Sequence, residues 1–592
     1  MKPSLILFLL SLPVLASAEK PNVLWIITDD QRLDSINAFN RITIENEDSP
    51  LGKVASPQVD RLAAMGTTFV NSFNQNPVCA PSRTAMHTGR YSHSSGVYGF
   101  DYYSGAGKAH WRPMVPEVMK EAGYRTVSVG KGGIRYIADP KKKVVGAPYE
   151  VDLGYLNEFA DAGRFDWVKS MEWKTKIVTD RFRFPDGSEL TWSSDPVAQP
   201  DDREELTKRL DILREYPPGK THDQAINAVD SIIGGINPQP PNMTREANYV
   251  KELISYLNSD EKTYTTLKGK KVPTIGKSPV FAHIGFDFPH TPVLPPAEFR
   301  ERFRNLKYKV PEFTEQEMAS FTPQLRKLYA GIGSNHFPDE HKQQMIADYY
   351  ALCAYGDSLV GQAADAFIEY SEKNQQPWLI LYVCGDHGWK LNEHGMIAKS
   401  SPYDIDLHNP IIVVSSDKKK FPAGRVVKDF TCFVDMAPTF FAAAGYDLSD
   451  SRFDYLDGKD LGQVSEGKIP ARDYIISEPT PLVVIRTKDY KLALKIRGGK
   501  NIGSMLKADL EDLEPIFFDL RNDPEELYNL ASDVYYRPVI DAMRTKLQNI
   551  VLGDGRVECK WTREGGEPVF VSNFAPGADD GKLELPKLPA KP

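Results

Sequence analysis

The sequence has few cysteines, little net charge and only a short apolar run at its N-terminus. Five cysteines in 592 residues exclude the dense disulfide framework of small secreted domains, although one or two disulfides could form. A net charge of −8 excludes the strongly basic surface on which nucleic-acid binding depends. Internal repeats and low-complexity tracts are absent. What remains is a large globular chain, 41% hydrophobic and 26% charged, for which no nucleic-acid partner is expected.

The first 18 residues are typical of a secretory signal peptide. Lys2 supplies a positive charge, residues 5–15 form the apolar segment, and Ala16-Ser17-Ala18 is an A-x-A cleavage site. The apolar segment is shorter than the roughly 20 residues that span a bilayer, and no cysteine follows the cleavage site to carry a lipid. We therefore expect an exported protein, periplasmic or secreted, without a membrane anchor.

Apolar runs that end in polar residues recur along the chain. Residues 21–28, 278–286 and 378–384 are such runs and are predicted to be buried parallel strands. Helical patterns lie between them, for example at 221–233 and 345–370. Strands that alternate with helices predict an α/β fold with a large, mainly parallel sheet sandwiched by helices. Because ligands bind beyond the carboxyl ends of such strands, the polar residues that follow the runs are expected to form one site.

Acidic residues follow two of these runs. Asp29-Asp30 ends the first run, and Asp386-His387 follows the third. Adjacent carboxylates repel each other unless a cation neutralises them. An ordinary acidic turn is the better interpretation of Asp29-Asp30 alone, but not once the second acidic pair is included. Because carboxylates favour Ca²⁺, Mg²⁺ or Mn²⁺, the residues themselves predict a site for a divalent metal.

Two other parts of the chain differ from this pattern. Residues 139–277 are rich in charge, proline and aromatic residues and are predicted to be an insertion of helices and loops in a main domain that spans 19–468. Residues 469–592 are predicted to form a smaller C-terminal subdomain and tail, with an antiparallel sheet followed by a helix at about 535–552. The predicted strands of that sheet lie in three apolar runs, at 482–486, 490–494 and 515–520.

The segment Cys79-Ala80-Pro81-Ser82-Arg83 is a pattern that core packing does not require. Cysteine becomes a nucleophile when positive charge lowers the pKa of its thiol, and Arg83 could supply that charge. A buried, inert cysteine is the alternative. Together with Thr88-Gly89-Arg90, the segment resembles the maturation signature of the type I sulfatases of the alkaline phosphatase superfamily. The resemblance implies that a formylglycine-generating or equivalent maturation enzyme converts Cys79 to formylglycine, whose hydrated aldehyde attacks sulfur.

The resemblance also implies a metal site and an alkaline phosphatase-like fold. In the family the metal is held by two aspartates at the first strand, by an Asp-Asn or Asp-His pair at a later strand, and by the formylglycine. These positions match Asp29, Asp30, Asp386, His387 and Cys79. Ca²⁺ is the expected ion. Because Ca²⁺ prefers oxygen ligands and His387 offers nitrogen, Mg²⁺ and Mn²⁺ remain alternatives.

Four further residues match positions that act on the sulfate ester in the family. Arg83, Lys131 and Lys399 would surround the sulfuryl oxygens with positive charge. His290, which lies between Pro289 and Thr291-Pro292, would protonate the leaving oxygen, a role for which Lys399 is the alternative. The motifs that most resemble iduronate-2-sulfatase-like bacterial sulfatases are Asp386-His387-Gly388-Trp389, Glu393-His394-Gly395 and Val127-Ser128-Val129-Gly130-Lys131. The expected activity is the hydrolysis of sulfate esters.

The sequence departs from the family at one place. Sulfatases usually have a histidine two or three residues after the lysine equivalent to Lys131, where this chain has Gly133 and Ile134. That histidine acts when sulfate is eliminated, so the base for this step is left open, with His87 and His110 as stand-ins. Two alternatives remain: a phosphonate or phosphate-ester hydrolase of the same superfamily, which would share the metal cluster, and a catalytically impaired glycan-binding relative, which the missing histidine suggests.

The substrate class is inferred from export and from the insertion. An exported enzyme whose insertion carries Trp167, Trp173 and Trp192 is expected to act on sulfated carbohydrate, although tryptophans more often pack in a core than bind sugar. The sequence predicts neither the sugar nor the position of its sulfate.

Overall fold

The computed structural model describes residues 19–589 except 101–102, 105–112, 135, 140–143, 146–147, 172–177, 194–201, 215–231, 496–507, 553–559, 565–566 and 572–578. The predicted signal peptide and nearly all of the predicted helix at 221–233 lie outside the described residues, as do His110, Trp173 and Cys559. In the described part of the chain, no helix is both long and apolar enough to cross a membrane.

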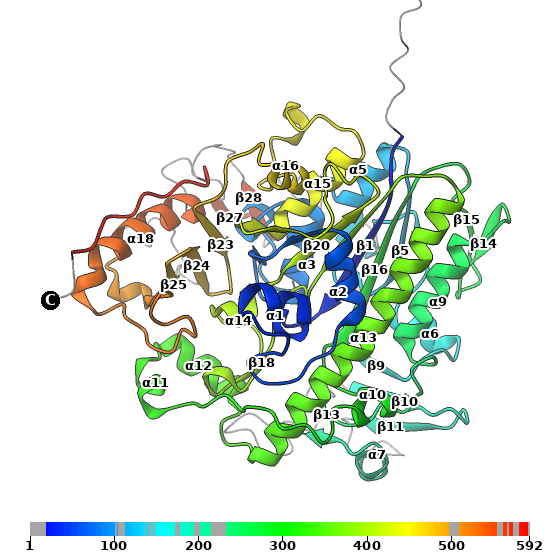
Figure 1. Ribbon diagram of the computed structural model, residues 1–592, viewed down its shortest axis with the longest axis horizontal. Helices are drawn as coiled ribbons and strands as arrows, with labels where there is room; N and C mark the ends of the chain where they lie inside the picture. The colour runs from blue at the N-terminus through cyan, green and yellow to red at the C-terminus, as the bar shows by residue number, and fades with distance from the viewer. Residues whose placement is uncertain are drawn as a thin grey trace, which may run out of the picture.

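An eight-stranded, mostly parallel sheet forms the centre of the molecule, in the order β21-β2-β20-β17-β1-β16-β5-β8 (Figure 1). Four parallel neighbours carry the site: β5 (Arg125–Gly130), β16 (Val280–Pro289), β1 (Asn22–Asp29) and β17 (Trp378–Val383). The other strands are β8 (Val151–Asp152), β20 (Ile411–Ser415), β2 (Thr67–Phe69) and β21 (Arg425–Val427), and β20 runs antiparallel to both of its neighbours. The three apolar runs that were predicted to be strands are β1, β16 and β17.

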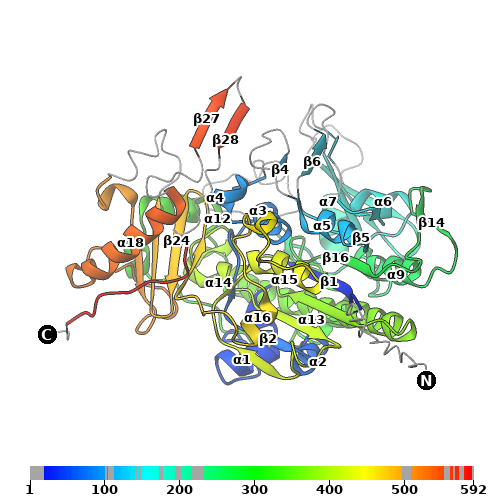
Figure 2. The ribbon, with the colours of Figure 1, turned by 90° about the horizontal axis from the view of Figure 1, so that it is seen from above.

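Helices cover both faces of this sheet (Figures 1 and 2). One layer contains α2 (Pro57–Met65), α9 (Arg245–Leu257) and α13 (Asp339–Lys373), and the other contains α3 (Cys79–Thr88), α5 (Val115–Glu121) and α15 (Met436–Ala443). Alternate residues of β1 face opposite layers: Leu24 and Ile26 lie in the first core, and Trp25 lies in the second. A strand buried on both faces needs apolar residues at every position, which explains the uninterrupted run. The predicted fold class is confirmed.

A second sheet lies near the C-terminus. The strands β23 (Tyr474–Ser477), β24 (Leu482–Thr487), β25 (Tyr490–Lys495) and β26 (Ile516–Asp519) pair antiparallel in that order. The helix α18 (Arg537–Leu552) packs on β24 and β25. Figure 2 shows this sheet and its helix at one end of the molecule. The predicted antiparallel sheet and helix are present, and the boundary at residue 469 stays a prediction.

The segment 139–277 contains more strand than the sequence predicts. The strands β9 (Trp167–Met171), β10 (Val178–Arg183) and β11 (Glu189–Ser193) form an antiparallel sheet, and β8 of the same segment extends the central sheet. The prediction of helices and loops alone was wrong here. In β10, Phe182 is buried while Arg181 is not, so the strand buries one face only and shows no apolar run.

The two described tryptophans of this segment do not form an open sugar platform. Trp192 is 3% exposed and packs with Phe182 and Phe184 in a small core. Trp167 is half-buried, and its ring lies 4.8 Å below the guanidinium carbon of Arg245. These two side chains therefore give no support to the inference of a carbohydrate substrate that was drawn from the tryptophans of the insertion.

Candidate active site

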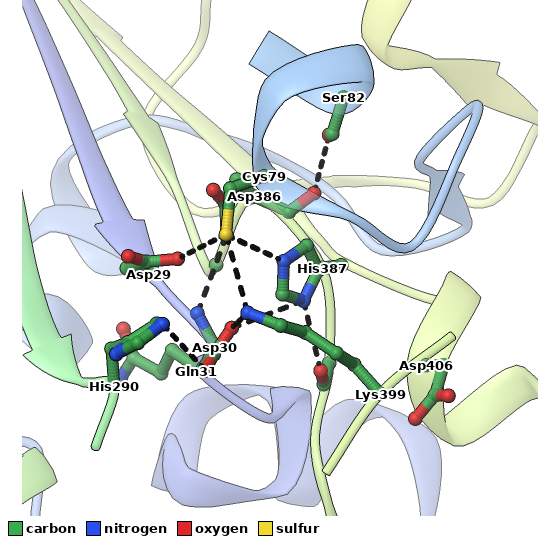
Figure 3. Close-up of polar contacts among 12 residues, drawn as sticks. Asp29, Asp30, Gln31, Cys79, Ser82, His290, Asp386, His387, Lys399 and Asp406 are labelled. Atoms are coloured by element: carbon green, nitrogen blue, oxygen red, sulfur yellow. Dashed lines mark hydrogen bonds and ion pairs between the residues drawn. The ribbon is translucent and has the colours of Figure 1, made fainter. Parts of the chain in front are cut away.

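Four strand ends bring the predicted polar residues together (Figure 3). The strand β1 ends at Asp29 and is followed by Asp30, and Asp386-His387 follows β17. His290 follows β16, and Lys131 follows β5. Because the four strands are parallel neighbours, their carboxyl ends lie along one edge of the sheet. The sequence expectation of a single site at this edge agrees with the geometry.

Cys79 reaches the same edge from the first turn of α3. Val78 before it is extended (φ −139°, ψ 137°), and the helix begins at the cysteine. Cys79 Sγ lies 3.3 Å from Asp29 Oδ1 and 3.3 Å from His387 Nε2, and Cys79 is 5% exposed. Figure 3 shows the sulfur at the centre of these side chains. All four described cysteines, Cys79 included, are free, so none of the disulfides that the sequence left possible forms among them.

Two lysines contact both the sulfur and the carboxylates. Lys399 Nζ lies 3.2 Å from Cys79 Sγ and donates to Asp30 Oδ1 at 2.7 Å. Lys131 Nζ forms an ion pair with Asp29 and lies 3.9 Å from Cys79 Sγ. Each lysine therefore joins one aspartate of the Asp29-Asp30 pair to the cysteine.

Arg83 supports the site through hydrogen bonds to two of its residues. Its Nε donates to Asp386 Oδ2 at 2.7 Å, and both side chains are fully buried. Its Nη1 donates to the carbonyl oxygen of Lys131 at 2.6 Å. Ser82, its neighbour in the motif, donates its hydroxyl to the carbonyl oxygen of Asp386. The N-terminal part of α3 is thus hydrogen-bonded to the side-chain carboxylate and the backbone carbonyl of Asp386, and to the backbone carbonyl of Lys131.

The thiol of Cys79 is not a low-pKa nucleophile. Burial raises the pKa of Cys79 well above its ordinary value, and the charge of Asp29 raises it further, while Lys131 and Lys399 oppose the rise. The positive charge of Arg83 is already paired with Asp386. The interpretation of Cys79 as a thiolate activated by Arg83 is therefore wrong.

The cluster is suited to a divalent metal. One ligand atom from each of Asp29, Asp30, Cys79, Asp386 and His387 lies within 4.8 Å of the others, and all five residues are buried. Asp30 Oδ2 is buried and accepts no hydrogen bond within the described structure, which is costly for a carboxylate unless a cation is near. Burial, together with the negative charge of Asp29, raises the pKa of Asp30 to about 6 against the opposing charge of Lys399. These residues fit a metal ion that relieves this repulsion.

His290 lies at the rim of the cluster. Its side chain is 25% exposed, whereas the neighbouring Asp30 is fully buried. His290 Nε2 lies 3.9 Å from Asp30 Oδ2, and Nδ1 lies 2.7 Å from the carbonyl oxygen of Thr291. The peptide bonds Phe288-Pro289 and Thr291-Pro292 on either side are cis. His290 is thus both solvent-accessible and next to the carboxylates.

Gly133 and Ile134, which stand where the family usually has a histidine, are both constrained by neighbouring side chains. Gly133 has φ 70°, and a Cβ there would lie 2.2 Å from Arg83 Cδ. Ile134 packs with Val97 and Met114 in a small apolar cluster. A side chain at 133 therefore needs Arg83 to move, and the side chain at 134 is directed into packing.

His87 is not available as a stand-in base. Its Nδ1 lies 2.8 Å from the carbonyl oxygen of Arg83, and its Nε2 lies 3.1 Å from Tyr149 Oη. Burial lowers the pKa of His87 to about 3. Its ring packs 4.5 Å from that of Trp25 in the second core. The second stand-in, His110, lies outside the described residues.

Two supporting residues were not predicted. Glu246 on α9 accepts hydrogen bonds from the backbone N–H groups of Asp287 and Phe288, at 2.7 and 2.8 Å, and so holds the end of β16. Tyr349 on α13 donates to the carbonyl oxygen of Asp30 at 2.6 Å, where Asp30 has φ 59°. No local signal marks either residue, because each contact joins a helix to a strand end that is distant in sequence.

Comparison with known proteins identifies the family. The family model described as Sulfatase matches residues 21–446, well over half of the chain. The chain therefore belongs to the sulfatase family and is a sulfuric ester hydrolase. It is similar to human iduronate 2-sulfatase, with 24% identity over 466 residues that cover 72% of this chain and 69% of the relative. It is also similar to the N-acetylglucosamine-6-O-sulfatase of Bacteroides thetaiotaomicron, with 22% identity over 553 residues, 88% of this chain and 85% of the relative.

A solved structure shares the fold. The phosphonate monoester hydrolase of Agrobacterium radiobacter superposes with a TM-score of 0.62, at 20% identity, over 93% of this chain and 99% of that one. The central sheet and the C-terminal antiparallel sheet are thus those of the alkaline phosphatase-like sulfatase fold.

Proposed function

We propose that this sulfatase is an exported enzyme that hydrolyses sulfate esters of carbohydrates, using formylglycine at position 79 and one divalent metal. The observation that carries the proposal is the position of Cys79 Sγ, 3.3 Å from Asp29 Oδ1, 3.3 Å from His387 Nε2 and 3.2 Å from Lys399 Nζ. A group at this position touches metal ligands and a cation at once. That is what a nucleophile needs in order to attack an anionic ester.

The metal and the modified residue would supply the reactive groups. Asp29, Asp30, Asp386 and His387 would hold the ion together with residue 79, with Ca²⁺ as the expected ion and Mg²⁺ or Mn²⁺ as alternatives. The metal would polarise the ester and formylglycine would provide a hydrated aldehyde as nucleophile. A formylglycine-generating or equivalent maturation enzyme is then a required partner.

The charges of the site favour an anionic substrate. Its three aspartates are matched by three cationic side chains, Arg83, Lys131 and Lys399. A divalent cation therefore leaves a local excess of positive charge in a site largely closed to water. Such an excess binds a sulfate group and stabilises the charge that develops on it during transfer.

Breaking the ester bond leaves an electron pair on the departing oxygen, which needs a proton. His290 supplies this proton, with Lys399 as the alternative, because His290 lies at the solvent-facing rim and 3.9 Å from Asp30 Oδ2. The ester and one water molecule thus yield an alcohol, sulfate and a proton.

The carbohydrate substrate is supported by relatives and not by the insertion. The names of two relatives, iduronate 2-sulfatase and N-acetylglucosamine-6-O-sulfatase, refer to sugars. The described tryptophans of the insertion are packed into structure and add no support. Export, to the periplasm or outside the cell, is supported by the signal-peptide pattern of residues 1–18.

A phosphonate or phosphate-ester hydrolase is the second candidate. The fold likeness to a phosphonate monoester hydrolase favours it, and the cationic cluster would also bind a phosphoryl group. A non-catalytic glycan-binding relative is disfavoured, because Cys79, Arg83, Lys131 and Lys399 are all present and in one cluster.

The proposal is tested with protein co-expressed with a maturation enzyme. Mass spectrometry of the peptide that contains Cys79 should detect formylglycine. Sulfate release from a panel of sulfated glycans, and from 4-nitrophenyl sulfate beside 4-nitrophenyl phosphate, should favour the sulfate esters. Cys79→Ala should abolish turnover, while Cys353→Ala, which removes another buried free thiol on α13, should not.

Three outcomes would contradict the proposal. A peptide that stays entirely thiol would remove the nucleophile. A preference for the phosphate ester would support the second candidate. Glycan binding without any turnover, unchanged in Cys79→Ala, would support the non-catalytic relative.

A further inference from the structure

The segment that carries Lys399 has an unusual backbone. Four non-glycine residues between 392 and 400 have positive φ: Asn392 (92°), His394 (56°), Ala398 (66°) and Ser400 (77°). Lys399 lies between the last two. A left-handed backbone is unfavourable for residues with a Cβ, and such residues persist only where the surrounding structure holds them. Something must therefore hold this segment in place.

Asp406 holds the segment at two points. It lies on the short helix α14 (Asp404–Leu407), and its Oδ2 accepts from the backbone N–H of Ser401 at 2.8 Å and from the Ser401 hydroxyl at 2.6 Å. The same oxygen accepts from Lys390 Nζ at 2.6 Å. Asp406, Ser401 and Lys390 are all fully buried. One carboxylate thus binds residues on both sides of Lys399 along the chain.

Lys390 and Ser401, the two residues that Asp406 binds, lie next to each other in the structure. Lys390 begins β18 (Lys390–Leu391), which pairs with β19 (Ile397–Ala398), and Lys390 lies opposite Ala398. Ala398 and Ser401 enclose the pair Lys399-Ser400. The contacts of Asp406 therefore hold the chain on both sides of Lys399, through Lys390 opposite Ala398 and through Ser401.

The C-terminal sheet holds the same helix from outside. Asp404 pairs with Arg486 of β24 at 3.0 Å, and its backbone N–H donates to Glu526 Oε2 at 2.6 Å. Lys491 of β25 is fully buried, forms ion pairs with Asp404 and Glu526, and donates to the carbonyl oxygen of Pro402 at 3.1 Å. The helix that bears Asp406 is thus fixed to the C-terminal sheet.

We propose that Asp406 is a positioning residue that holds the ammonium group of Lys399 against Asp30 and residue 79. Lys399 Nζ reaches Asp30 Oδ1 and Cys79 Sγ (Figure 3). Its backbone is held by the contacts of Asp406 with Ser401 and Lys390. The inference rests on the proposed function only where it concerns catalysis. Its statement about the position of Lys399 can be tested without any turnover.

The first test measures the reactivity of Lys399 towards a water-soluble N-hydroxysuccinimide ester, followed by peptide mass spectrometry. The Lys399 side chain is 17% exposed and held in an ion pair, so it should react slowly in the wild type. Asp406→Asn should label Lys399 several-fold faster. Asp348→Asn is the matched control, because Asp348 is equally buried and paired with Arg300 far from this segment in sequence. It should leave the labelling of Lys399 unchanged.

The second test is a double-mutant cycle on kcat with 4-nitrophenyl sulfate. Loss of about 1 Å of positioning costs about 100-fold in rate, so Asp406→Asn should lower kcat by about this factor with little change in KM. In the Lys399→Ala background the same substitution should have almost no effect, whereas the effect of Asp348→Asn should be the same in both backgrounds.

If Asp406→Asn does not fold, Ser401→Ala removes one of the two Ser401 contacts and should give the same changes with smaller size. Unchanged labelling of Lys399 in a folded Asp406 or Ser401 variant overturns the positioning role. Faster labelling in a protein that proves to have no sulfatase activity upholds the positioning role and refutes the proposed function alone. Additive losses in the double-mutant cycle would show a merely structural role.

Discussion

Replacing Gly133 with alanine tests the close approach between the backbone at Gly133, which follows β5 in the chain, and the side chain of Arg83. The Cβ of alanine would lie 2.2 Å from Arg83 Cδ, much closer than two carbon atoms can come. Arg83 must then shift, and it carries the hydrogen bonds to Asp386 Oδ2 and to the carbonyl oxygen of Lys131. The substitution should therefore disturb the site although it removes no functional group.

The magnitude has two parts. The φ of 70° at Gly133 costs alanine about 1–2 kcal/mol, and the collision adds about 1–3 kcal/mol. Gly269 isolates the first part, because it has φ 73° and a Cβ there would have nothing within 4 Å of it. Gly132 has no positive φ and the same open surroundings, so alanine there should be almost neutral. Displacement of Arg83 by about 1 Å should lower kcat/KM by about 100-fold in Gly133→Ala only.

The assay compares the midpoint of thermal unfolding and kcat/KM for 4-nitrophenyl sulfate among the three matured variants. The expected order of stability is Gly132→Ala, then Gly269→Ala, then Gly133→Ala. The reasoning is refuted if Gly133→Ala unfolds at the temperature of Gly269→Ala and keeps wild-type kcat/KM. The same contact predicts that Gly133→His cannot restore the family histidine unless Arg83 is also replaced.

Two further predictions concern the metal and pH. Removal of divalent ions with a chelator should lower both activity and the thermal midpoint, and Ca²⁺, Mg²⁺ or Mn²⁺ should restore both; full activity after chelation, with no shift by any of the three ions, would contradict the metal site. Burial raises the pKa of Asp357 from 3.8 to about 7, against the effect of hydrogen bonds from the backbone N–H groups of Val59 and Gln58. The folded protein thus holds this proton more tightly than the unfolded chain, so the contribution of Asp357 to stability is complete below about pH 4 and is lost as pH rises through about 7. The difference in thermal midpoint between the wild type and Asp357→Asn should therefore change between pH 5 and pH 8, with the wild type losing stability relative to the variant as pH rises, and a constant difference would refute the assignment.

The residues at the strand ends were predictable because burial leaves a strong signal. A strand such as β1, covered on both faces, must be apolar throughout, so the abrupt change to Asp29-Asp30 marks its end. The same signal located His290 and Asp386-His387. The motif around Cys79 identified the remaining member of the cluster, Cys79 itself, which lies at the start of α3 and not at a strand end.

The supporting contacts were not predictable, because they join segments that are far apart in the chain. Glu246 and Tyr349 look like ordinary helix residues, and only the folded structure brings them to Asp287 and Asp30. The strands of the insertion were missed for a different reason. In β10, for example, the buried Phe182 lies between Arg181 and Arg183, which are partly exposed, so no apolar run marks the strand.

The central position of β1 has a consequence for the order in which the chain can fold. Val23 pairs with Phe281 on one side and with Leu379 on the other, so the first strand to be synthesised finds its partners among the later ones. Such distant pairing folds slowly, because long loops must close before the contacts form. Until β17 is made, the sheet edge that buries Cys79 is incomplete, and the contacts of Cys79 with His387 and Lys399 cannot form. A maturation enzyme that needs an extended substrate would have that whole interval in which to act.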